Sequence, residues 1–179
     1  GKTVLILGAG CIGLMTLQAC VLMGAERIVV ADVIERRLEK ALQLGAWHVI
    51  NGRKEDTVDR SRALFGGDGA DIVFETAGSR VTAMQSFASV RRGGEVMIVG
   101  TIPGETPVDF LKINREVKVQ TVFRYANNFP MTIQAISSGR FDVLTMVTDE
   151  YTYEDVQKAF EESLSRKAEI IKGVIKISD

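Results

Sequence analysis

Short apolar runs alternate with amphipathic stretches and glycine-rich turns along most of this chain. The run from Thr3 to Leu7 is rich in strand-forming residues and continues without a spacer into the turn Gly8-Ala9-Gly10-Cys11-Ile12-Gly13. Residues Leu14 to Met23 contain neither proline nor glycine and predict a helix. A second apolar run, Arg27 to Ala31, predicts a strand that ends at Asp32. The chain therefore begins as strand, glycine turn, helix, strand and carboxylate.

The same alternation continues as far as Phe123 and predicts one parallel sheet. Helices are expected at Glu35–Leu44, Arg53–Phe65 and Ser79–Val90, a turn at Arg91–Gly94, and further strands at 48–51, 70–74, 95–99 and 116–123. The last of these strands alternates between apolar and polar residues, which suits the edge of a sheet. Strands that alternate with helices form parallel sheets with right-handed crossovers. The predicted fold is a doubly wound α/β fold with a six-stranded parallel sheet.

The pattern changes in the last part of the chain. A helix is expected from Pro130 to about Ser138, followed by a strand at Leu144–Thr148, a charged helix at Glu154–Ser165 and a strand at Gly173–Ile177. The last two strands have no obvious place in the first sheet, so they pair with each other or with a part of the protein outside this chain. We expect one domain at residues 1–142 and a C-terminal helix-strand extension at residues 143–179.

The three glycines of the first turn suit a phosphate-binding site. Gly8 lets the chain turn sharply out of the strand, Gly10 leaves room for a pyrophosphate, and Gly13 lets the helix pack closely on the strand. Unpaired N–H groups and the helix dipole make the start of the following helix an anion site. Cys11 lies within this glycine turn and is assigned to the same site.

Asp32 predicts which dinucleotide binds. A carboxylate at the end of the second strand, about 20 residues beyond the glycine turn, can accept hydrogen bonds from both ribose hydroxyls of an adenosine. It also repels a 2′-phosphate, so NAD is expected rather than NADP. Arg37, in the next helix, either covers the adenine or reaches the ribose, or is a solvated helix residue. A glycine-rich turn alone is weak evidence, but here a preceding strand, a following helix, a second strand and an acid coincide.

Two further turns follow predicted strands and are expected at the same edge of the sheet, because parallel sheets bind ligands beyond the carboxyl ends of their strands. Thr76 and Ala77 are predicted to border the cofactor, whereas the Glu75 carboxylate is expected to cap the next helix. The segment Val99–Thr101 is predicted to lie where a nicotinamide ring binds, since a β-branched residue beside a glycine can cover one face of a flat ring. Its alternative is a strand end with an ordinary turn.

Arg124 and Tyr125 stand at the end of the last predicted strand of the sheet. A guanidinium and a phenol side by side at this edge can bind phosphate, ribose hydroxyls or a polyhydroxylated substrate. A surface salt bridge and a half-buried aromatic ring would explain the same two residues. Composition does not decide between these interpretations.

The charge and hydropathy of the chain argue against several classes of binding partner. The 179 residues carry 22 basic and 23 acidic side chains, a net charge of −1, so neither nucleic acid nor an anionic membrane surface is expected as a partner. The stretch Thr3–Ala25 carries no charge and is long enough to span a bilayer, but its closely spaced glycines argue against a continuous helix. No signal peptide is visible, so a cytoplasmic location is expected.

The sequence offers few metal ligands. Cys11 and Cys20 are expected to be small buried residues on roughly opposite sides of one helix, which disfavours a disulfide or a shared metal between them. His48 is the only histidine and is expected to be structural. We therefore assign no metal ligand in this chain.

Taken together, these motifs resemble the cofactor-binding Rossmann domain of the zinc-dependent medium-chain alcohol dehydrogenases, and within them the sorbitol and xylitol (polyol) dehydrogenases. The general marks are the glycine turn, Asp32, Phe74–Gly78, and Arg92-Gly93-Gly94 before Val99-Gly100. The more specific mark is Val122-Phe123-Arg124-Tyr125-Ala126-Asn127. The resemblance implies that Arg124 and Tyr125 face the substrate. It also implies an NAD site lined by Ile12, Asp32, Arg37, Val99, Gly100, Thr101, Val122, Phe123 and Arg124.

The resemblance also implies what this chain lacks. In the family an earlier domain binds the catalytic zinc and supplies most of the proton relay, and this chain begins, without an initiator Met, where the first Rossmann strand begins. Cys11, Cys20 and His48 do not match the zinc ligands, so we expect a fragment with no catalytic residue of its own. Residues from about Val143 onward would pack on the missing domain. Asp149 stands where many relatives carry a histidine, so this loop departs from the family pattern.

The implied function of the intact enzyme is zinc-assisted oxidation of a polyol, with hydride transfer to NAD and a homo-oligomeric assembly. Two alternatives remain at this stage. A stand-alone module that senses NAD/NADH would need no chemistry. A methyltransferase has a similar glycine turn and acid, but a methyl-donor site requires neither the Val99 position nor the pair Arg124 and Tyr125.

Overall fold

A computed structural model describes residues 1–113 and 116–177 of the chain. It contains two compact units, Gly1–Asn128 and Phe129–Asp179, which are treated separately below. The division between the units falls earlier than the domain boundary expected after residue 142. That boundary was inferred from how the C-terminal segment would pack in an intact enzyme, and it stays a prediction.

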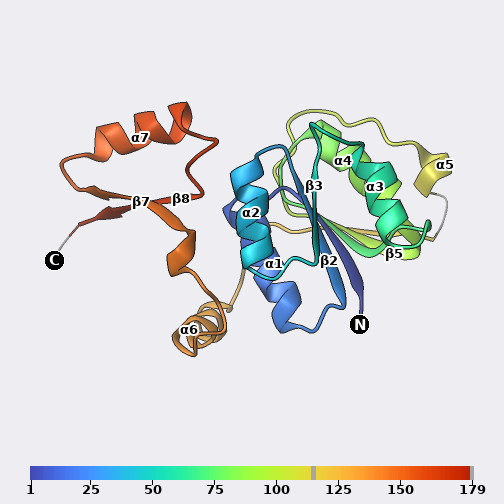
Figure 1. Cartoon of the computed structure of the whole chain (residues 1–179), viewed down its shortest axis with the longest axis horizontal. Helices are drawn as coiled ribbons and strands as arrows, with labels where there is room; N and C mark the ends of the chain where they lie inside the picture. Colours follow the sequence, from blue (N-terminus) through green and yellow to red (C-terminus); the bar gives the residue numbers. More distant parts are fainter. Residues whose placement is uncertain (114–115, 178–179) are drawn as a thin grey trace. The chain divides into compact units, whose positions relative to one another are not determined.

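Strands and helices alternate through the first unit (Figure 1). Its strands are β1 (Thr3–Leu7), β2 (Arg27–Asp32), β3 (His48–Asn51), β4 (Ala70–Glu75), β5 (Val90–Ile98) and β6 (Lys118–Thr121). Its helices are α1 (Cys11–Leu22), α2 (Glu35–Gln43), α3 (Thr57–Leu64), α4 (Arg80–Ser89) and the short α5 (Phe110–Ile113). The strands pair in parallel in the order β3-β2-β1-β4-β5-β6, which confirms the predicted six-stranded α/β fold of Rossmann type.

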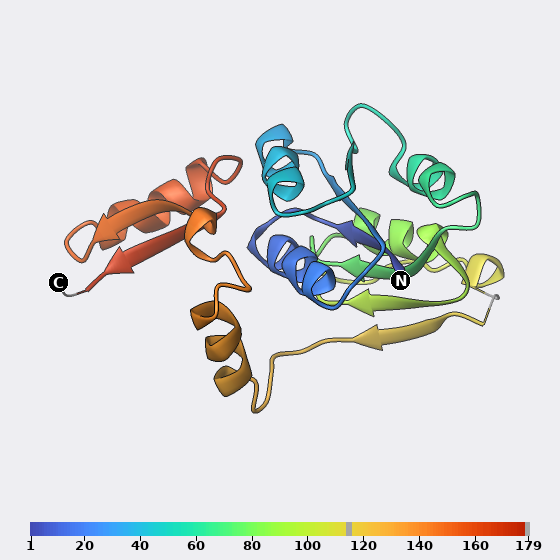
Figure 2. The same ribbon diagram turned by 60° about the horizontal axis from the view of Figure 1, so that its bottom comes forward.

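The strand order determines where a ligand can bind. The chain moves from β1 outward to β3, then crosses back to β4 on the other side of β1 and continues outward to β6. Because such crossovers are right-handed, α1 and α2 cover one face of the sheet and α3 and α4 the other, as the two views show (Figures 1 and 2). The carboxyl ends of β1 and β4 therefore form the switch point, where open α/β sheets bind their ligands.

The central strands are buried because their residues are apolar on both faces. Leu5, Leu7, Val29 and Val73 are at most 1% exposed, as expected for a parallel sheet covered on two sides. The uncharged stretch from Thr3 to Ala25 thus forms a strand, a turn and a helix. No helix in the described residues is long and apolar enough to cross a membrane.

Asp71 joins three strands at the opposite, amino-terminal edge of the sheet. Its carboxylate accepts hydrogen bonds from the Thr3 backbone N–H and hydroxyl, both at 2.8 Å, and from Arg91 Nε at 2.6 Å. Burial alone would raise the pKa of Asp71, but these hydrogen bonds and the charge of Arg91 outweigh it and hold the pKa at about 2. The Asp71 carboxylate therefore links β1, β4 and β5 through these hydrogen bonds.

Three element boundaries differ from the sequence-based expectation. Helix α3 begins at Thr57 rather than Arg53, because the Asp56 carboxylate caps it by accepting a hydrogen bond from Asp59 N at 2.9 Å. The expected turn at 91–94 lies inside β5 as an irregularity, where the register jumps from Ala70 opposite Val90 to Ile72 opposite Glu95. Strand β6 has four exposed residues and is shorter than expected, although it does form the edge of the sheet.

The second unit holds one βαβ motif. Its elements are α6 (Phe129–Ser137), a short 3₁₀ helix η1 (Leu144–Met146), β7 (Val147–Thr152), α7 (Val156–Ser165) and β8 (Lys172–Lys176). Strands β7 and β8 pair with each other in parallel. The strand expected from Leu144 is wrong at its start, because the Asp142 carboxylate binds the N–H and hydroxyl of Thr145 and stabilises a helical turn there.

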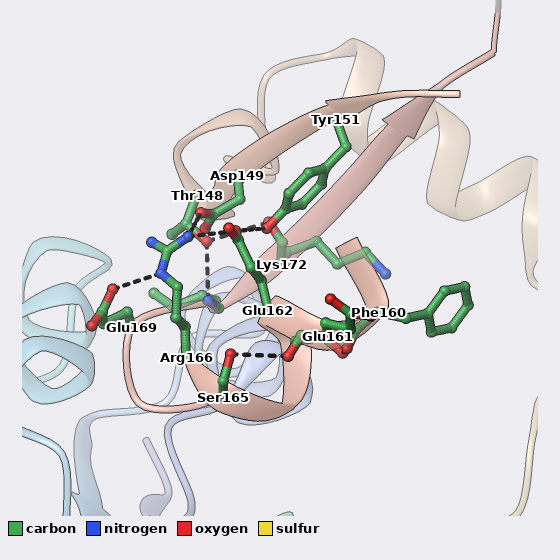
Figure 3. A network of polar contacts seen from close by, with 12 residues as sticks. Thr148, Asp149, Tyr151, Phe160, Glu161, Glu162, Ser165, Arg166, Glu169 and Lys172 are labelled. Atoms are coloured by element: carbon green, nitrogen blue, oxygen red, sulfur yellow. Dashed lines mark hydrogen bonds and ion pairs between the residues drawn. The ribbon is translucent and has the colours of Figure 1, made fainter. Parts of the chain in front are cut away.

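Arg166 holds this motif together (Figure 3). Its Nη1 donates to Asp149 Oδ1 at 3.0 Å and to Glu162 Oε2 at 2.8 Å, and its Nε donates to Glu169 Oε2 at 2.9 Å. The Tyr151 hydroxyl donates to the same Glu162 oxygen at 2.9 Å. These contacts tie β7 to the end of α7. Asp149, which departs from the family pattern, thus has a structural partner within its own unit.

Candidate cofactor-binding site

The first glycine turn is shaped by two glycines that the fold itself requires. Gly8 has a φ of 105°, and a Cβ there would lie 2.9 Å from Ala77 N. A Cβ at Gly13 would overlap the Gly8 carbonyl oxygen, so α1 could not approach β1 as it does. Both positions therefore confirm the expected reasons for glycine, a sharp turn and close packing of the helix.

Gly10 differs from these two positions. Its φ of −73° and ψ of −174° are open to any residue. Leaving aside its chain neighbours and its own helix, the nearest described atom to a Cβ at Gly10 would be Arg37 Nη1 at 4.0 Å. Neither a positive φ nor steric crowding therefore requires glycine at this position.

The start of α1 is suited to an anion. Within the described part of the chain, no side chain caps this helix and its first turn carries no acidic residue. The helix has 12 residues, and the N–H groups of its first turn have no acceptor within the helix. Cys11 and Ile12, both assigned to the site from the sequence, are the first residues of this helix.

The Thr76 hydroxyl stabilises the glycine turn that follows β1. Its hydroxyl lies 3.0 Å from both the Leu7 and the Gly8 carbonyl oxygens, and a hydroxyl with one hydrogen shares it between them. Its side chain also lies 3.0 Å from a Cβ built on Gly8. The Thr76 hydroxyl therefore fixes the glycine turn, and its role beside a cofactor stays a prediction.

Asp32 is fixed by the backbone around it. One carboxylate oxygen accepts from Ala9 N at 2.6 Å, and the other accepts from Val33 N at 2.7 Å and Ile34 N at 2.9 Å. The first contact, which ties the end of β2 to the glycine turn, was not predicted from the sequence. Oδ1 already accepts two hydrogen bonds, but Oδ2 accepts only one and can accept another, so Asp32 is also able to bind a ribose hydroxyl.

A first cavity of about 400 Å³ opens beside Asp32 at the carboxyl ends of β1, β2 and β4. It is lined by Leu7, Gly8, Ala31, Asp32, Val33, Gly52, Thr57, Ala77, Ser79, Val81, Thr82 and Gln85. Nine of these twelve residues were not predicted as site residues, and six of the nine lie in or next to β3, α3 and α4. Their roles depend on which helix faces meet the sheet edge, although Val33 and Gly52 could have been inferred because each directly follows a strand.

A second cavity of about 500 Å³ lies at the ends of β4, β5 and β6. Nine of its ten lining residues were predicted from the sequence, namely Ile12, Thr76, Ala77, Val99, Gly100, Thr101, Val122, Arg124 and Tyr125, and the tenth is Gly78. Phe123 was assigned to the site as well, but it does not line the cavity. Its ring is 83% exposed and lies 5.2 Å from Arg124 Cζ.

Glu75 has a different role from the expected helix cap. The Ser79 hydroxyl caps α4 by accepting from Thr82 N at 3.1 Å. Glu75 instead uses Oε1 to accept from Ala77 N at 3.0 Å, Gly78 N at 2.9 Å and the Thr82 hydroxyl at 2.7 Å. Its carboxylate thus shapes the turn that separates the two cavities, because Ala77 lines both of them.

The described residues include no group of three or more histidine, cysteine, aspartate or glutamate side chains that could hold a metal ion. Cys11 and Cys20 are free thiols, and both are half-buried rather than buried as expected. Burial raises the pKa of Cys20 to about 11, which disfavours the thiolate that a metal needs. His48 Nε2 lies 3.3 Å from Arg60 Nη2. The expectation that zinc is bound outside this chain stays a prediction.

Comparison with known proteins identifies a family that the chain matches. A profile described as zinc-binding dehydrogenase matches residues 11–138. The chain belongs to this family. It is 65% identical to the uncharacterized zinc-type alcohol dehydrogenase-like protein YdjJ of Escherichia coli strain K12, over 100% of this chain and 52% of that protein. It is 38% identical to a sorbitol dehydrogenase of Bacillus subtilis strain 168, over 98% of this chain and 50% of that enzyme.

Solved structures agree with the family assignment. The chain superposes with a TM-score of 0.97 on an Escherichia coli oxidoreductase/dehydrogenase of unknown specificity, described as involved in membrane biogenesis, at 65% identity. That match covers 100% of this chain and 52% of the other. The zinc-binding dehydrogenase chain described here therefore spans about half the length of the relatives that it matches.

Proposed function

We propose that this chain is the NAD-binding part of a zinc-dependent dehydrogenase that oxidises a secondary alcohol of a polyol, of the sorbitol, xylitol or iditol type, to a ketose. The family assignment supports the reaction class, and the similarity to a sorbitol dehydrogenase supports the substrate class. NAD supplies the hydride acceptor, and a zinc ion held by another part of the protein supplies a Lewis acid.

The observation that carries this proposal is the space in front of Gly10. A residue with ordinary backbone angles and no crowding has no steric need to be glycine, and Gly10 is the N-cap residue of α1, whose start no described side chain caps. A pyrophosphate bound to these N–H groups explains both features, because it requires close approach to the backbone and gains from the helix dipole.

Asp32 sets the preference for NAD over NADP in this proposal. Its carboxylate is held at the edge of the first cavity by Ala9 N and Val33 N, so it cannot move away from a 2′-phosphate without losing these hydrogen bonds. The adenosine would occupy the first cavity, with Arg37 beside the pyrophosphate.

The second cavity suits the nicotinamide ring. Ile12 and Val122 are 55% and 39% exposed, and they present apolar side chains to a ring that would otherwise be in water. Val99 and Thr101 would hold one face of the ring and leave the other face open for stereospecific transfer. Arg124 and Tyr125 line the same cavity and would bind the substrate hydroxyls. None of these residues carries out proton transfer.

A fluorescence titration of the 179-residue chain with NADH and NADPH tests the proposal. We expect saturable binding of NADH, with NADPH at least about tenfold weaker, and a melting temperature that rises with NADH. Absence of NADH binding would contradict the proposal. The cytoplasmic location and the homo-oligomeric assembly stay predictions.

Two variants make the titration specific. Gly10→Val should abolish NADH binding and leave the melting temperature of the free chain close to that of the wild type, whereas Cys20→Val, at the far end of the same helix, should bind NADH normally. Asp32→Asn keeps an acceptor for Ala9 N but removes the charge, so it should reduce the preference for NADH over NADPH by about tenfold. An unchanged preference would disprove the role of Asp32.

A further inference from the structure

Glu75 is a buried carboxylate that the proposed function does not yet use. Its side chain lies at the end of β4 and is 0% exposed. Oε1 accepts three hydrogen bonds, from Ala77 N, Gly78 N and the Thr82 hydroxyl. These three contacts fix the carboxyl group against the turn between β4 and α4.

The other oxygen, Oε2, is buried and has no hydrogen-bond partner among the residues that the structure describes. It lies behind the wall of the second cavity, because a Cβ on Gly100 would come within 2.5 Å of it, and Gly78 and Gly100 both line that cavity. Buried polar atoms in proteins nearly always have partners, and a buried charge without compensation is costly. This oxygen therefore calls for an explanation.

Nearby cations in the described residues do not supply the compensation. Arg80 Nε donates to the Pro103 carbonyl oxygen at 3.2 Å. Arg124 lines the cavity, but its guanidinium lies over the exposed Phe123 ring. Neither forms an ion pair with Glu75, so within the described residues the carboxylate has only the hydrogen bonds to Oε1.

We infer that Glu75 selects the oxidation state of the bound cofactor, because its buried negative charge stabilises the positively charged nicotinamide ring of NAD⁺ and not the neutral ring of NADH. The inference rests on the proposed NAD site and adds to it a favoured direction of the reaction, the oxidation of the alcohol. A site that prefers NAD⁺ is ready for alcohol oxidation and releases NADH readily. Glu75 acts here as a positioning and electrostatic residue, since two glycines separate it from the ring.

The first test compares ligands on the wild-type chain by isothermal titration calorimetry. The probes are NAD⁺, NADH and benzamide adenine dinucleotide, a neutral aromatic isostere of NAD⁺ in which carbon replaces the ring nitrogen. Opposite unit charges about 10 Å apart at a protein surface change an affinity roughly tenfold. We expect NAD⁺ to bind about tenfold more tightly than the isostere. Equal affinities would overturn the inference.

The second test uses Glu75→Gln, which keeps the shape and removes the charge. NAD⁺ and the isostere should bind this variant equally, while its affinity for NADH stays within about twofold of the wild type. Thr82→Val is the matched control, because it removes one hydrogen bond to Glu75 Oε1 and keeps the charge. It should retain the advantage of NAD⁺ over the isostere. Loss of that advantage in Thr82→Val, or its survival in Glu75→Gln, would overturn the inference.

The outcomes separate the two proposals. If none of the three dinucleotides binds to the wild type, the proposed function fails and the inference fails with it. If all three bind and the ring charge makes no difference, only the inference fails. The wild-type comparison decides the matter even if Glu75→Gln does not fold.

Discussion

The contacts of the Asp71 carboxylate with Thr3 and Arg91 lead to a prediction about stability in acid. Asp71→Asn removes the charge that binds Arg91 at 2.6 Å and weakens both hydrogen bonds from Thr3. Since these contacts join β1, β4 and β5 at one edge of the sheet, their loss should destabilise the first unit. The site at the opposite, carboxyl-terminal edge should keep its geometry.

The size of the effect follows from the pKa of Asp71. The difference between the ordinary value of 3.8 and the folded value of about 2 corresponds to about 2.5 kcal/mol of unfolding free energy. The Asp71 side chain is 17% exposed but Arg91 is 39% exposed, so solvent screening reduces this figure, and we expect about 1.5 kcal/mol. Because the folded pKa is lowered, this stability is fully present above 3.8 and is lost as the pH falls through about 2.

Urea unfolding of wild type and variant, at pH values between about 6 and 2, measures this difference. The matched control is Glu95→Gln, which also changes an acid to an amide but acts on an exposed pair, with Lys118 Nζ at 3.7 Å, and should cost less than about 0.5 kcal/mol. The reasoning is refuted if Asp71→Asn costs no more than the control at about pH 6. It is also refuted if the difference between wild type and Asp71→Asn does not shrink on acidification.

Two further predictions concern α1. Gly13→Ala should lower the free energy of unfolding by more than about 3 kcal/mol, because its Cβ would overlap a backbone oxygen that cannot move aside, and a thermal melt with near-normal stability would disprove this. Burial raises the pKa of Cys20 to about 11, so with Cys11 replaced by serine, iodoacetamide at about pH 8 should modify the folded chain at least about tenfold more slowly than the urea-unfolded chain. Equal rates would contradict the burial of this thiol.

The fold could be predicted from the sequence because its signals are local. Near-continuous apolar runs mark the buried strands of a parallel sheet, and the helices between them carry amphipathic patterns. The errors arose where a short-range contact decides a boundary. Asp56 starts α3 four residues later than the charge pattern indicates, and Asp142 turns Leu144–Met146 into a helical turn that apolar composition could not reveal.

The candidate site was predictable mainly where it lies on strand ends or in the glycine turn. Val99, Gly100 and Thr101 follow β5 directly, so their place in the second cavity could be read from the strand pattern. Thr57 and Gln85 line the first cavity from helices, and their inclusion depends on how α3 and α4 pack on the sheet. For Phe123 the position in the sequence was misleading. Its neighbours Val122 and Arg124 line the second cavity, but its own side chain does not.

Glycine and carboxylate residues show most clearly what the structure adds. The sequence assigns the same motif to Gly8, Gly10 and Gly13, yet only Gly10 has neither a positive φ nor a crowded Cβ position, and this contrast supports the proposed pyrophosphate site. Asp32 and Glu75 both end strands, but Asp32 borders a cavity and can bind a hydroxyl directly, whereas Glu75 is closed off and can act only through its field. In the proposed complex the two carboxylates therefore act on opposite ends of one dinucleotide. Asp32 distinguishes cofactors by the phosphate on the ribose, and Glu75 distinguishes them by the charge on the ring.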